Sequence, residues 1–203
     1  MDSPHPEAAP SRRLAPSDLM SLEQYARSRA EFRARVIEHK RPRTVAVGPH
    51  TTWCFEDRLT VQYQVQEMLR AERIFEAQGI QEELDAYNPL IPDGGNLKAT
   101  LLIEFTDPTE RAAALVRLKG IERRCFLAIG DEVCWAIADE DLERENETKT
   151  SAVHFLRFEL SPPARGFLAA GAPLKAGVDH PAYAHTLVLA DATRAALAAD
   201  LAP

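Results

Sequence analysis

The chain has 203 residues, of which 45% are hydrophobic and 27% charged, so it can bury one substantial core and does not have the composition of a disordered protein. Its 24 Lys and Arg residues against 31 Asp and Glu residues give a net charge of −7, which opposes binding to nucleic acid or an anionic membrane. No apolar run is long enough to cross a bilayer, and the N-terminus has no apolar signal segment. We therefore expect a cytoplasmic protein with a disordered lead-in at residues 1–16 and one domain over residues 17–203.

The three cysteines, Cys54, Cys125 and Cys134, form no CxxC pair, which argues against a zinc ribbon, an iron–sulfur cluster or a disulfide framework. A two-residue turn at 130–131 places Cys134 opposite Leu127 and diagonal to Cys125. A diagonal pair is about 7 Å apart, beyond the reach of a disulfide. We expect buried free thiols.

A helix followed by a hairpin is predicted after the lead-in. Ser17 can cap a helix over residues 18–40, in which apolar residues recur near a 3.6-residue period and after which Pro42 ends the helix. The β-prone runs 44–48 and 51–56 then indicate two antiparallel strands joined by a short turn.

Helical spacing returns over residues 58–78, which predicts one long helix. Asp57 can cap its first turn, and Gly79 can close its last turn in the left-handed conformation. Residues 88–96 contain two prolines and two glycines and predict a loop. The apolar stripe of the helix consists of Val61, Val65, Met68, Leu69 and Phe75.

The second half of the chain alternates strand and helix patterns. Strands are predicted at 97–105, 123–129, 132–138, 150–160 and 185–189, and helices at 108–119, 162–171 and 191–201. The whole pattern predicts an α+β fold, in which a mostly antiparallel sheet of four to five strands packs against helices.

Common catalytic and nucleotide-binding motifs are missing from the sequence. It contains no GxGxxG, no Walker GxxxxGK[ST], no HExxH and no GxSxG. Dinucleotide folds, P-loop proteins, zincins and α/β-hydrolases therefore lack support, and attention moves to clusters of polar side chains.

His50 and Glu56 form the first of these clusters, around the predicted hairpin and the start of the long helix. Their neighbour Asp57 suits a helix N-terminus, where free N–H groups and the helix dipole favour negative charge. Asp57 is thus either a helix cap or part of a ligand-binding group.

A polar stripe on the long helix forms the second cluster. Gln62, Gln66 and Arg70 repeat every four residues and share one side, with Glu67 beside them. The stripe is either a solvated helix face or the lining of a polar pocket. Its glutamines favour the pocket, because an exposed face usually has more Lys and Glu.

His154 lies in the predicted strand 150–160. Alternation of side chains places it with Leu156 and Phe158, facing inward, and places Arg157 on the opposite face, where it can meet an acidic partner. His154 is either a hydrogen-bonded core histidine or a ligand.

The segment DHPAYAH brings Asp179, His180, Tyr183 and His185 within seven residues. Neutral imidazole is the commonest metal ligand, and an adjacent carboxylate can ligate or fix the ring tautomer. The alternative is a structured turn, in which Asp179 caps the backbone and Pro181 fixes its own φ angle.

Several long segments resemble a bacterial family catalogued as domain of unknown function 3501, over nearly the whole chain after the N-terminal tail. They include VGPHTTWCFEDRLTVQYQVQEMLRAERIF, IQEELDAYNPLIPDGGNLKATLLIEF and AGVDHPAYAH. The resemblance implies a genomic setting beside rubrerythrin-like and iron–sulfur proteins, and hence a part in iron- or peroxide-linked redox biology.

Three hypotheses of function follow. The first is an accessory protein that binds a metal or cofactor, with iron or zinc as the metal. The second is an interaction module that docks a rubrerythrin-like or iron–sulfur partner, for which the acidic segment 139–149 is a candidate surface. The third is an enzyme whose polar pocket joins Gln62, Gln66, Glu67 and Arg70 to the histidines, with Tyr183 as a further pocket residue. The predicted metal ligands are His50, His154, His180 and His185, with Glu56 or Asp179 as carboxylate support.

Overall fold

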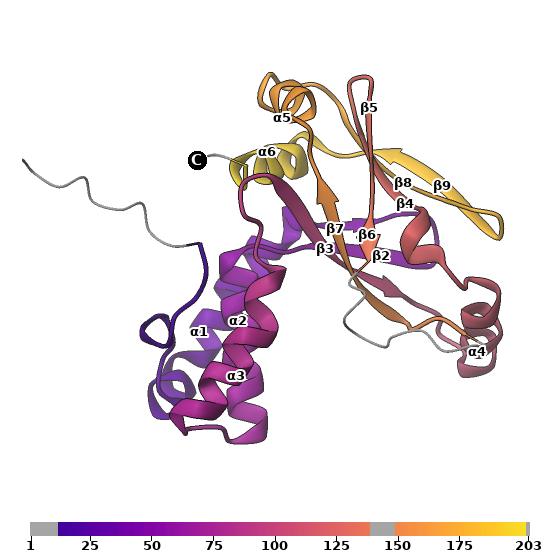
Figure 1. Ribbon diagram of the computed structural model, residues 1–203. Coiled ribbons are helices and arrows are strands. Elements are labelled where there is room, and N and C mark those ends of the chain that lie inside the picture. Colours follow the sequence, from indigo (N-terminus) through magenta and orange to yellow (C-terminus); the bar gives the residue numbers. More distant parts are fainter. Residues whose placement is uncertain (1–11, 139–148, 202–203) are drawn as a thin grey trace, which may run out of the picture.

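A computed structural model describes residues 12–138 and 149–201. The N-terminal half of the chain supplies three helices that lie side by side at one end of the molecule (Figure 1). These are α1 (Leu22–Lys40), α2 (Arg58–Glu72) and α3 (Ala77–Tyr87). Their contacts enclose two small apolar clusters, one formed by Val61, Val65, Leu69 and Leu84 with neighbouring residues and one by Tyr25, Phe32 and Val36.

The first helix begins later than predicted. Its N-cap is Ser21, whose hydroxyl accepts a hydrogen bond from the N–H of Gln24 while the Gln24 side chain accepts one from the N–H of Ser21. This reciprocal capping box is more favourable than a cap at Ser17, which lies within a short 3₁₀ turn at Pro16–Asp18. The predicted disordered lead-in is also too long, because Leu14 is buried, whereas residues 1–11 lie outside the described part of the chain.

The predicted single helix over residues 58–78 is two helices. Asp57 caps α2 as expected, but Arg73 adopts the left-handed conformation, with φ of 57°, and ends the helix. The N–H of Ile74 then bonds to the C=O of Leu69, as in a Schellman motif. Consequently Phe75 leaves the apolar stripe and is 74% exposed.

The strands form two antiparallel sheets (Figure 1). One sheet has five strands, in the order β1 (Thr44–Ala46), β2 (Thr51–Phe55), β3 (Asn96–Ile103), β7 (Val153–Glu159) and β6 (Ile137–Ala138). The other has four strands, in the order β5 (Glu132–Trp135), β4 (Cys125–Ile129), β8 (Leu174–His180) and β9 (Tyr183–Val188). The expected α+β fold with antiparallel strands is confirmed.

The main core contains buried residues from both sheets. Trp53 of β2 stacks on Phe158 of β7, with ring centroids 5.6 Å apart, and Leu127 of β4 and Val178 of β8 belong to the same cluster. Three further helices complete the fold: α4 (Pro108–Arg117), α5 (Pro162–Ala169) and α6 (Asp191–Ala199). The cysteines are free thiols, as expected, and burial raises the pKa of the Cys125 thiol.

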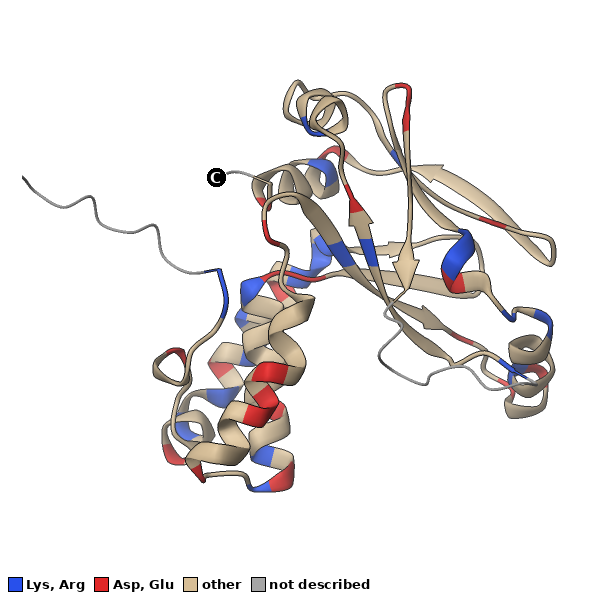
Figure 2. Cartoon of the chain, in the orientation of Figure 1, with Lys and Arg blue, Asp and Glu red and all other residues tan. Residues whose placement is uncertain are grey.

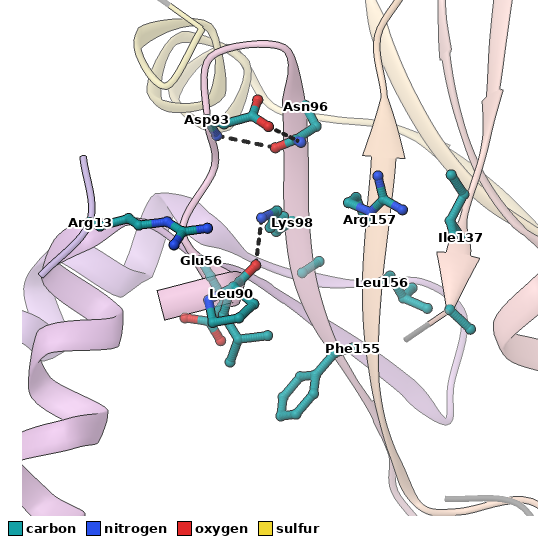
Figure 3. Close-up of a pocket in the computed structure, with 13 residues that line it drawn as sticks. Arg13, Glu56, Leu90, Asp93, Asn96, Lys98, Ile137, Phe155, Leu156 and Arg157 are labelled. Atoms are coloured by element: carbon teal, nitrogen blue, oxygen red, sulfur yellow. Dashed lines mark hydrogen bonds between the residues drawn. The ribbon is translucent and has the colours of Figure 1, made fainter. Parts of the chain in front are cut away.

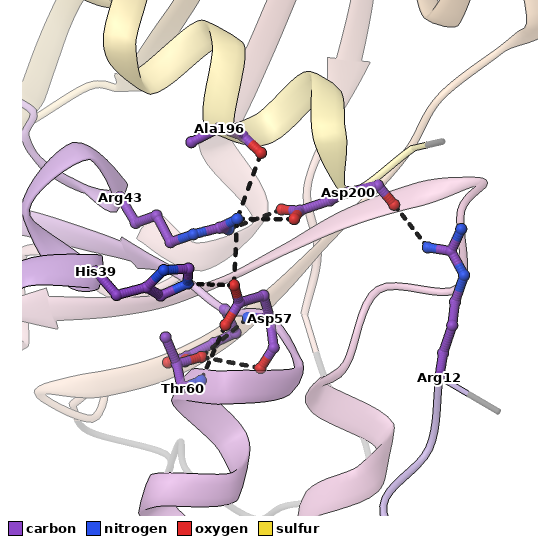
Figure 4. Close-up of polar contacts among 8 residues, drawn as sticks. Arg12, His39, Arg43, Asp57, Thr60, Ala196 and Asp200 are labelled. Atoms are coloured by element: carbon purple, nitrogen blue, oxygen red, sulfur yellow. Dashed lines mark hydrogen bonds and ion pairs between the residues drawn. The ribbon is translucent and has the colours of Figure 1, made fainter. Parts of the chain in front are cut away.

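A network of ion pairs joins the helical part to the C-terminus (Figure 4). Arg43, directly after α1, contacts Asp200 after α6 and also Asp57, the cap of α2. His39 approaches the same Asp57 carboxylate, with Nε2 2.5 Å from Oδ2. Three segments distant in sequence are therefore fixed around one guanidinium group.

Within residues 12–138 and 149–201, no helix combines the length and the apolar composition that crossing a membrane requires.

Candidate ligand-binding cleft

The five-stranded sheet has one face toward the core and one face away from it. On the outer face, cross-strand pairing places Lys98 of β3 directly opposite Arg157 of β7, and Arg157 directly opposite Ile137 of β6. Glu56, just after β2, adjoins this row, because its N–H bonds to the C=O of Lys98. One row across the sheet thus carries a carboxylate, two cations and an apolar side chain.

This row forms the floor of a cleft of about 500 Å³ (Figure 3). One wall is the segment after α3, including Leu90 and Asp93, and Arg13 from the N-terminal segment reaches over the opening. Figure 3 shows the cationic groups of Arg13, Lys98 and Arg157 in a row across it. The full lining is Arg13, Glu56, Pro89, Leu90, Asp93, Asn96, Lys98, Ala99, Ile137, Ala138, Phe155, Leu156 and Arg157.

Lys98 is partly buried, and burial disfavours the charged form of its amine. Its amine donates hydrogen bonds to the backbone C=O groups of Pro89 and Ile91, at 2.5 and 3.0 Å. Burial lowers the pKa of Lys98, and the nearby positive charges of Arg157 and Arg13 lower it further, although Asp93 opposes them. The protein therefore holds an ammonium group where the surroundings disfavour its charge.

The carboxylates around the cleft are occupied by local hydrogen bonds. Glu56 accepts from the hydroxyls of Thr60 and Thr100, at 2.5 and 2.6 Å, one on each oxygen. Burial alone would raise the pKa of Asp93, but hydrogen bonds from the Gly95 N–H and the Asn96 amide lower it overall. Neither carboxylate forms an ion pair with Lys98 among the described residues.

Two of the predicted histidines, His154 and His180, occupy separate hydrogen-bonded niches. His154 faces inward as expected, and its Nε2 lies 2.8 Å from the Thr150 hydroxyl and 3.0 Å from the C=O of Ser151. His180 Nε2 lies 3.1 Å from the C=O of Lys119, and its Nδ1 accepts from the N–H of Ala182. Both rings are therefore satisfied structurally, which was the alternative reading for each.

Tyr183 lies between His50 and His185 and connects two hairpins through hydrogen bonds. The Tyr183 hydroxyl donates to the C=O of Val47 at 2.8 Å and accepts from the N–H of His50 at 2.9 Å. A Cβ added to Gly48 would lie 2.5 Å from that hydroxyl and 2.6 Å from the His185 ring, so the turn of the β1–β2 hairpin must be glycine there. The DHPAYAH segment thus fastens the β8–β9 hairpin to the β1–β2 hairpin.

The predicted metal centre does not assemble. Among the residues that the structure describes, no three His, Cys, Asp or Glu side chains form a group that could hold a metal ion. Asp179 instead pairs with Arg124, at 2.5 Å, and Glu56 belongs to the cleft. Spacing in sequence placed these side chains near one another, but strand alternation and the two-sheet topology separate them.

The polar stripe of α2 faces α1 and the segment before it. Gln66 is fully buried, and its amide bonds to both backbone groups of Met20, while Gln62 donates to the C=O of Asp18 at 2.6 Å. Arg29 and Tyr25 bind the Glu67 carboxylate, and the hydrogen bonds from Arg29 lower the pKa of Glu67 to about 2. Arg70 is 44% exposed and lies 3.5 Å from Glu67. These contacts account for the stripe without a ligand.

Lys98 and Arg13 were not predicted as site residues, and Arg157 was predicted on the outer face of its strand but not in a site. The alternation in 150–160 placed Arg157 on the outer face. The sequence did not show that this strand pairs with residues 97–105 or in which register, and the register is what sets Lys98 against Arg157.

Comparison with known proteins identifies the family. A family model described as protein of unknown function (DUF3501) matches residues 13–201. The chain is similar to a novel protein of unknown function from Burkholderia pseudomallei K96243, with 53% identity, a TM-score of 0.89, and coverage of 93% of this chain and 99% of that one. No curated protein matches the sequence. The chain therefore belongs to the DUF3501 family of proteins of unknown function.

Proposed function

We propose that this protein binds a small organic anion in the cleft on the outer face of the five-stranded sheet. The observation that carries the proposal is the direct opposition of Lys98 and Arg157 in the β3–β7 pair. Like charges that face each other across an antiparallel pair destabilise the sheet. A carboxylate or phosphate between them would remove that repulsion and stabilise the charged form of Lys98.

The polar groups of the cleft match an oxyanion. The ammonium group of Lys98 donates to the neutral C=O groups of Pro89 and Ile91, and Arg13, which also lines the cleft, is exposed. Arg157 pairs with Glu159 but keeps further N–H donors, because a guanidinium group has five. The Glu56 and Asp93 carboxylates are bound by hydroxyl, amide and N–H groups, so they do not neutralise Lys98 directly.

The apolar groups of the cleft favour a ligand with a hydrophobic body. Leu90, Ile137 and Phe155 line it beside the cations, and Ile137 is 42% exposed. Apolar walls with a few polar groups are typical of small-molecule sites, and about 500 Å³ is within their usual range of roughly 300–1,000 Å³. The proposed ligand is therefore an aromatic or aliphatic acid or phosphate ester.

The proposed site is a specific version of the first hypothesis, an accessory protein that binds a metal or cofactor. An accessory protein of an iron- or peroxide-linked redox system would, on this proposal, hold an organic cofactor or metabolite and not a metal ion. That redox setting comes from the family resemblance alone. Docking of a rubrerythrin-like or iron–sulfur partner is a separate proposal, and residues 139–148 of its acidic segment lie outside the described residues.

Calorimetric titration with three matched probes tests the proposal. Benzoate is expected to bind, whereas benzyl alcohol and benzylamine, of similar size, should bind at least about tenfold more weakly, because only benzoate supplies negative charge. Phenyl phosphate distinguishes a phosphate preference from a carboxylate preference.

Variants of the cleft complete the test. Lys98→Met and Arg157→Gln should each weaken benzoate binding by about tenfold or more, while Arg33→Gln, at an exposed position of α1, should leave it unchanged. Circular dichroism and thermal melts would verify that each variant is folded. Equal binding of benzoate and benzylamine, or no effect of either cleft variant, would contradict the proposal.

A further inference from the structure

The four-stranded sheet ends in β9, which lies at its edge. The N–H and C=O groups on one side of β9 pair with β8, from Lys175–Val188 to His180–Tyr183. Among the described residues, no backbone hydrogen bond joins the other side of Tyr183–Val188 to a further strand. An edge of this kind is a template for another strand.

Among the described residues, the strands at the other sheet edges are shorter than β9. β1 has three residues, β6 has two and β5 has four, whereas β9 has six. Short edge strands, edge charges and prolines are the usual means of preventing edge-to-edge association. β9 has none of these, because its sequence YAHTLV contains no Lys, Arg, Asp, Glu or Pro. In Figure 2, β9 is accordingly tan along its length.

We infer that two copies of this chain associate through β9, antiparallel across a twofold axis, so that two four-stranded sheets become one continuous sheet. Twofold pairing sets a strand against its own sequence, so any charged residue near the axis would meet a like charge. The chain as a whole carries a net charge of −7 and repels its copies, but β9 contains no Lys, Arg, Asp or Glu and can meet itself without like-charge repulsion between such residues.

The side chains of β9 that face outward would extend the contact. Ala184, Thr186 and Val188 are exposed and share one face, and Val188 is 59% exposed. On the neighbouring strands this face continues with Phe126, Val133 and Trp135. A twofold axis at Leu187 would set Thr186 of each copy opposite Val188 of the other and remove apolar surface from water. Because β9 has no Lys, Arg, Asp or Glu that would repel its own copy, the partner that this edge fits best is a second copy of the chain.

Sedimentation equilibrium of the full chain tests this inference. The wild-type protein should have twice the 22.6 kDa mass of one chain. A variant with Thr186→Glu and Val188→Glu should sediment as a single chain, because four carboxylates would then meet at the axis. Glu at position 188 faces Lys175 of its own chain, which limits the cost to the fold.

A matched control adds the same charge elsewhere. Ile37 on α1 and Val116 on α4 are 45% and 53% exposed, and a variant with Ile37→Glu and Val116→Glu should still form the dimer. Amide hydrogen exchange gives a second measurement, in which protection of β9 should rise with protein concentration in the wild type and the control variant but not in the β9 variant. A wild-type protein of single-chain mass, or a dimer lost in the control variant and kept in the β9 variant, would overturn the inference. Either result is independent of ligand binding in the cleft, which lies on the other sheet.

Discussion

Arg43 and Asp200 lie 157 residues apart in the sequence and form a two-pronged ion pair. Each terminal nitrogen of Arg43 is 2.8 Å from one carboxylate oxygen of Asp200, and the side chains are only 6% and 10% exposed. Burial raises the pKa of Asp200, although the hydrogen bonds and charge of Arg43 oppose that shift. The pair fixes the end of α6 against the segment that follows α1.

Removing one partner of this pair should be costly. Arg43→Met leaves the buried Asp200 carboxylate uncompensated, so the free energy of unfolding should fall by about 3–5 kcal/mol. The double variant with Arg43→Met and Asp200→Leu should lose less than the sum of the two single variants, because no buried charge is then left alone.

Urea denaturation would measure both effects. Arg41→Gln is the control, because Arg41 forms an exposed ion pair with Glu38 and should change stability by less than about 0.5 kcal/mol. A single Arg43→Met variant as stable as the Arg41 control would show that the network contributes little.

The fold class could be predicted from the sequence because it depends on local patterns. Alternation placed His154 inward, and the turn at 130–131 placed Cys134 opposite Leu127. Asp57 and Asp107 cap their helices because a short acceptor before an apolar run satisfies free N–H groups. These features need only neighbours in the chain.

Other elements depend on distant contacts and were not predicted. Strand β8 was not predicted, although Lys175 and Asp179 alternate with buried residues, and Gly177 is required where the Phe126 ring packs against the backbone. The separation of strands into two sheets was not predicted either. The cleft was not predicted for the same reason: it depends on the register between β3 and β7, which are distant in the sequence.

The Gln66 side chain should matter to stability, and its neighbour Arg70 should not. Gln66 Oε1 accepts from the N–H of Met20 at 2.6 Å, and its Nε2 donates to the C=O of the same residue. Gln66→Leu would leave two backbone groups without a partner and should cost about 1–3 kcal/mol.

Arg70→Ala removes only a half-exposed contact with Glu67 and should cost less than about 0.5 kcal/mol. Thermal and urea unfolding of the two variants would compare them directly. A larger loss for Arg70→Ala than for Gln66→Leu would favour the pocket that the sequence predicted for this stripe.

The break between α2 and α3 should become more stable with glycine. Arg73 has φ of 57°, a left-handed conformation that costs a residue with a Cβ about 1 kcal/mol. Arg73→Gly should therefore raise the free energy of unfolding by roughly 0.5–1 kcal/mol, in spite of the greater freedom of glycine in the unfolded chain. Arg73→Ala, which keeps the Cβ, is the control and should give no such gain. Unfolding curves of both variants would decide between them.

The hydrogen-bonded carboxylate of Glu67 should make stability depend on pH in the acid range. Hydrogen bonds from Arg29 lower its pKa from an ordinary value of 4.5 to about 2, so between these values the unfolded chain binds more protons than the folded chain. The stabilisation is therefore present above pH about 4.5 and is lost as the pH falls toward 2.

Glu67→Gln keeps the size of the side chain but has no carboxylate to titrate, and at pH 7 it should be less stable than the wild type by about 1–3 kcal/mol. Urea unfolding at several pH values would show that difference shrinking below pH about 4.5, whereas an exposed control, Glu31→Gln, should show almost no difference at any pH. A gap between wild type and Glu67→Gln that stayed constant down to pH about 2.5 would mean that the ion pair with Arg29 does not hold the carboxylate ionised.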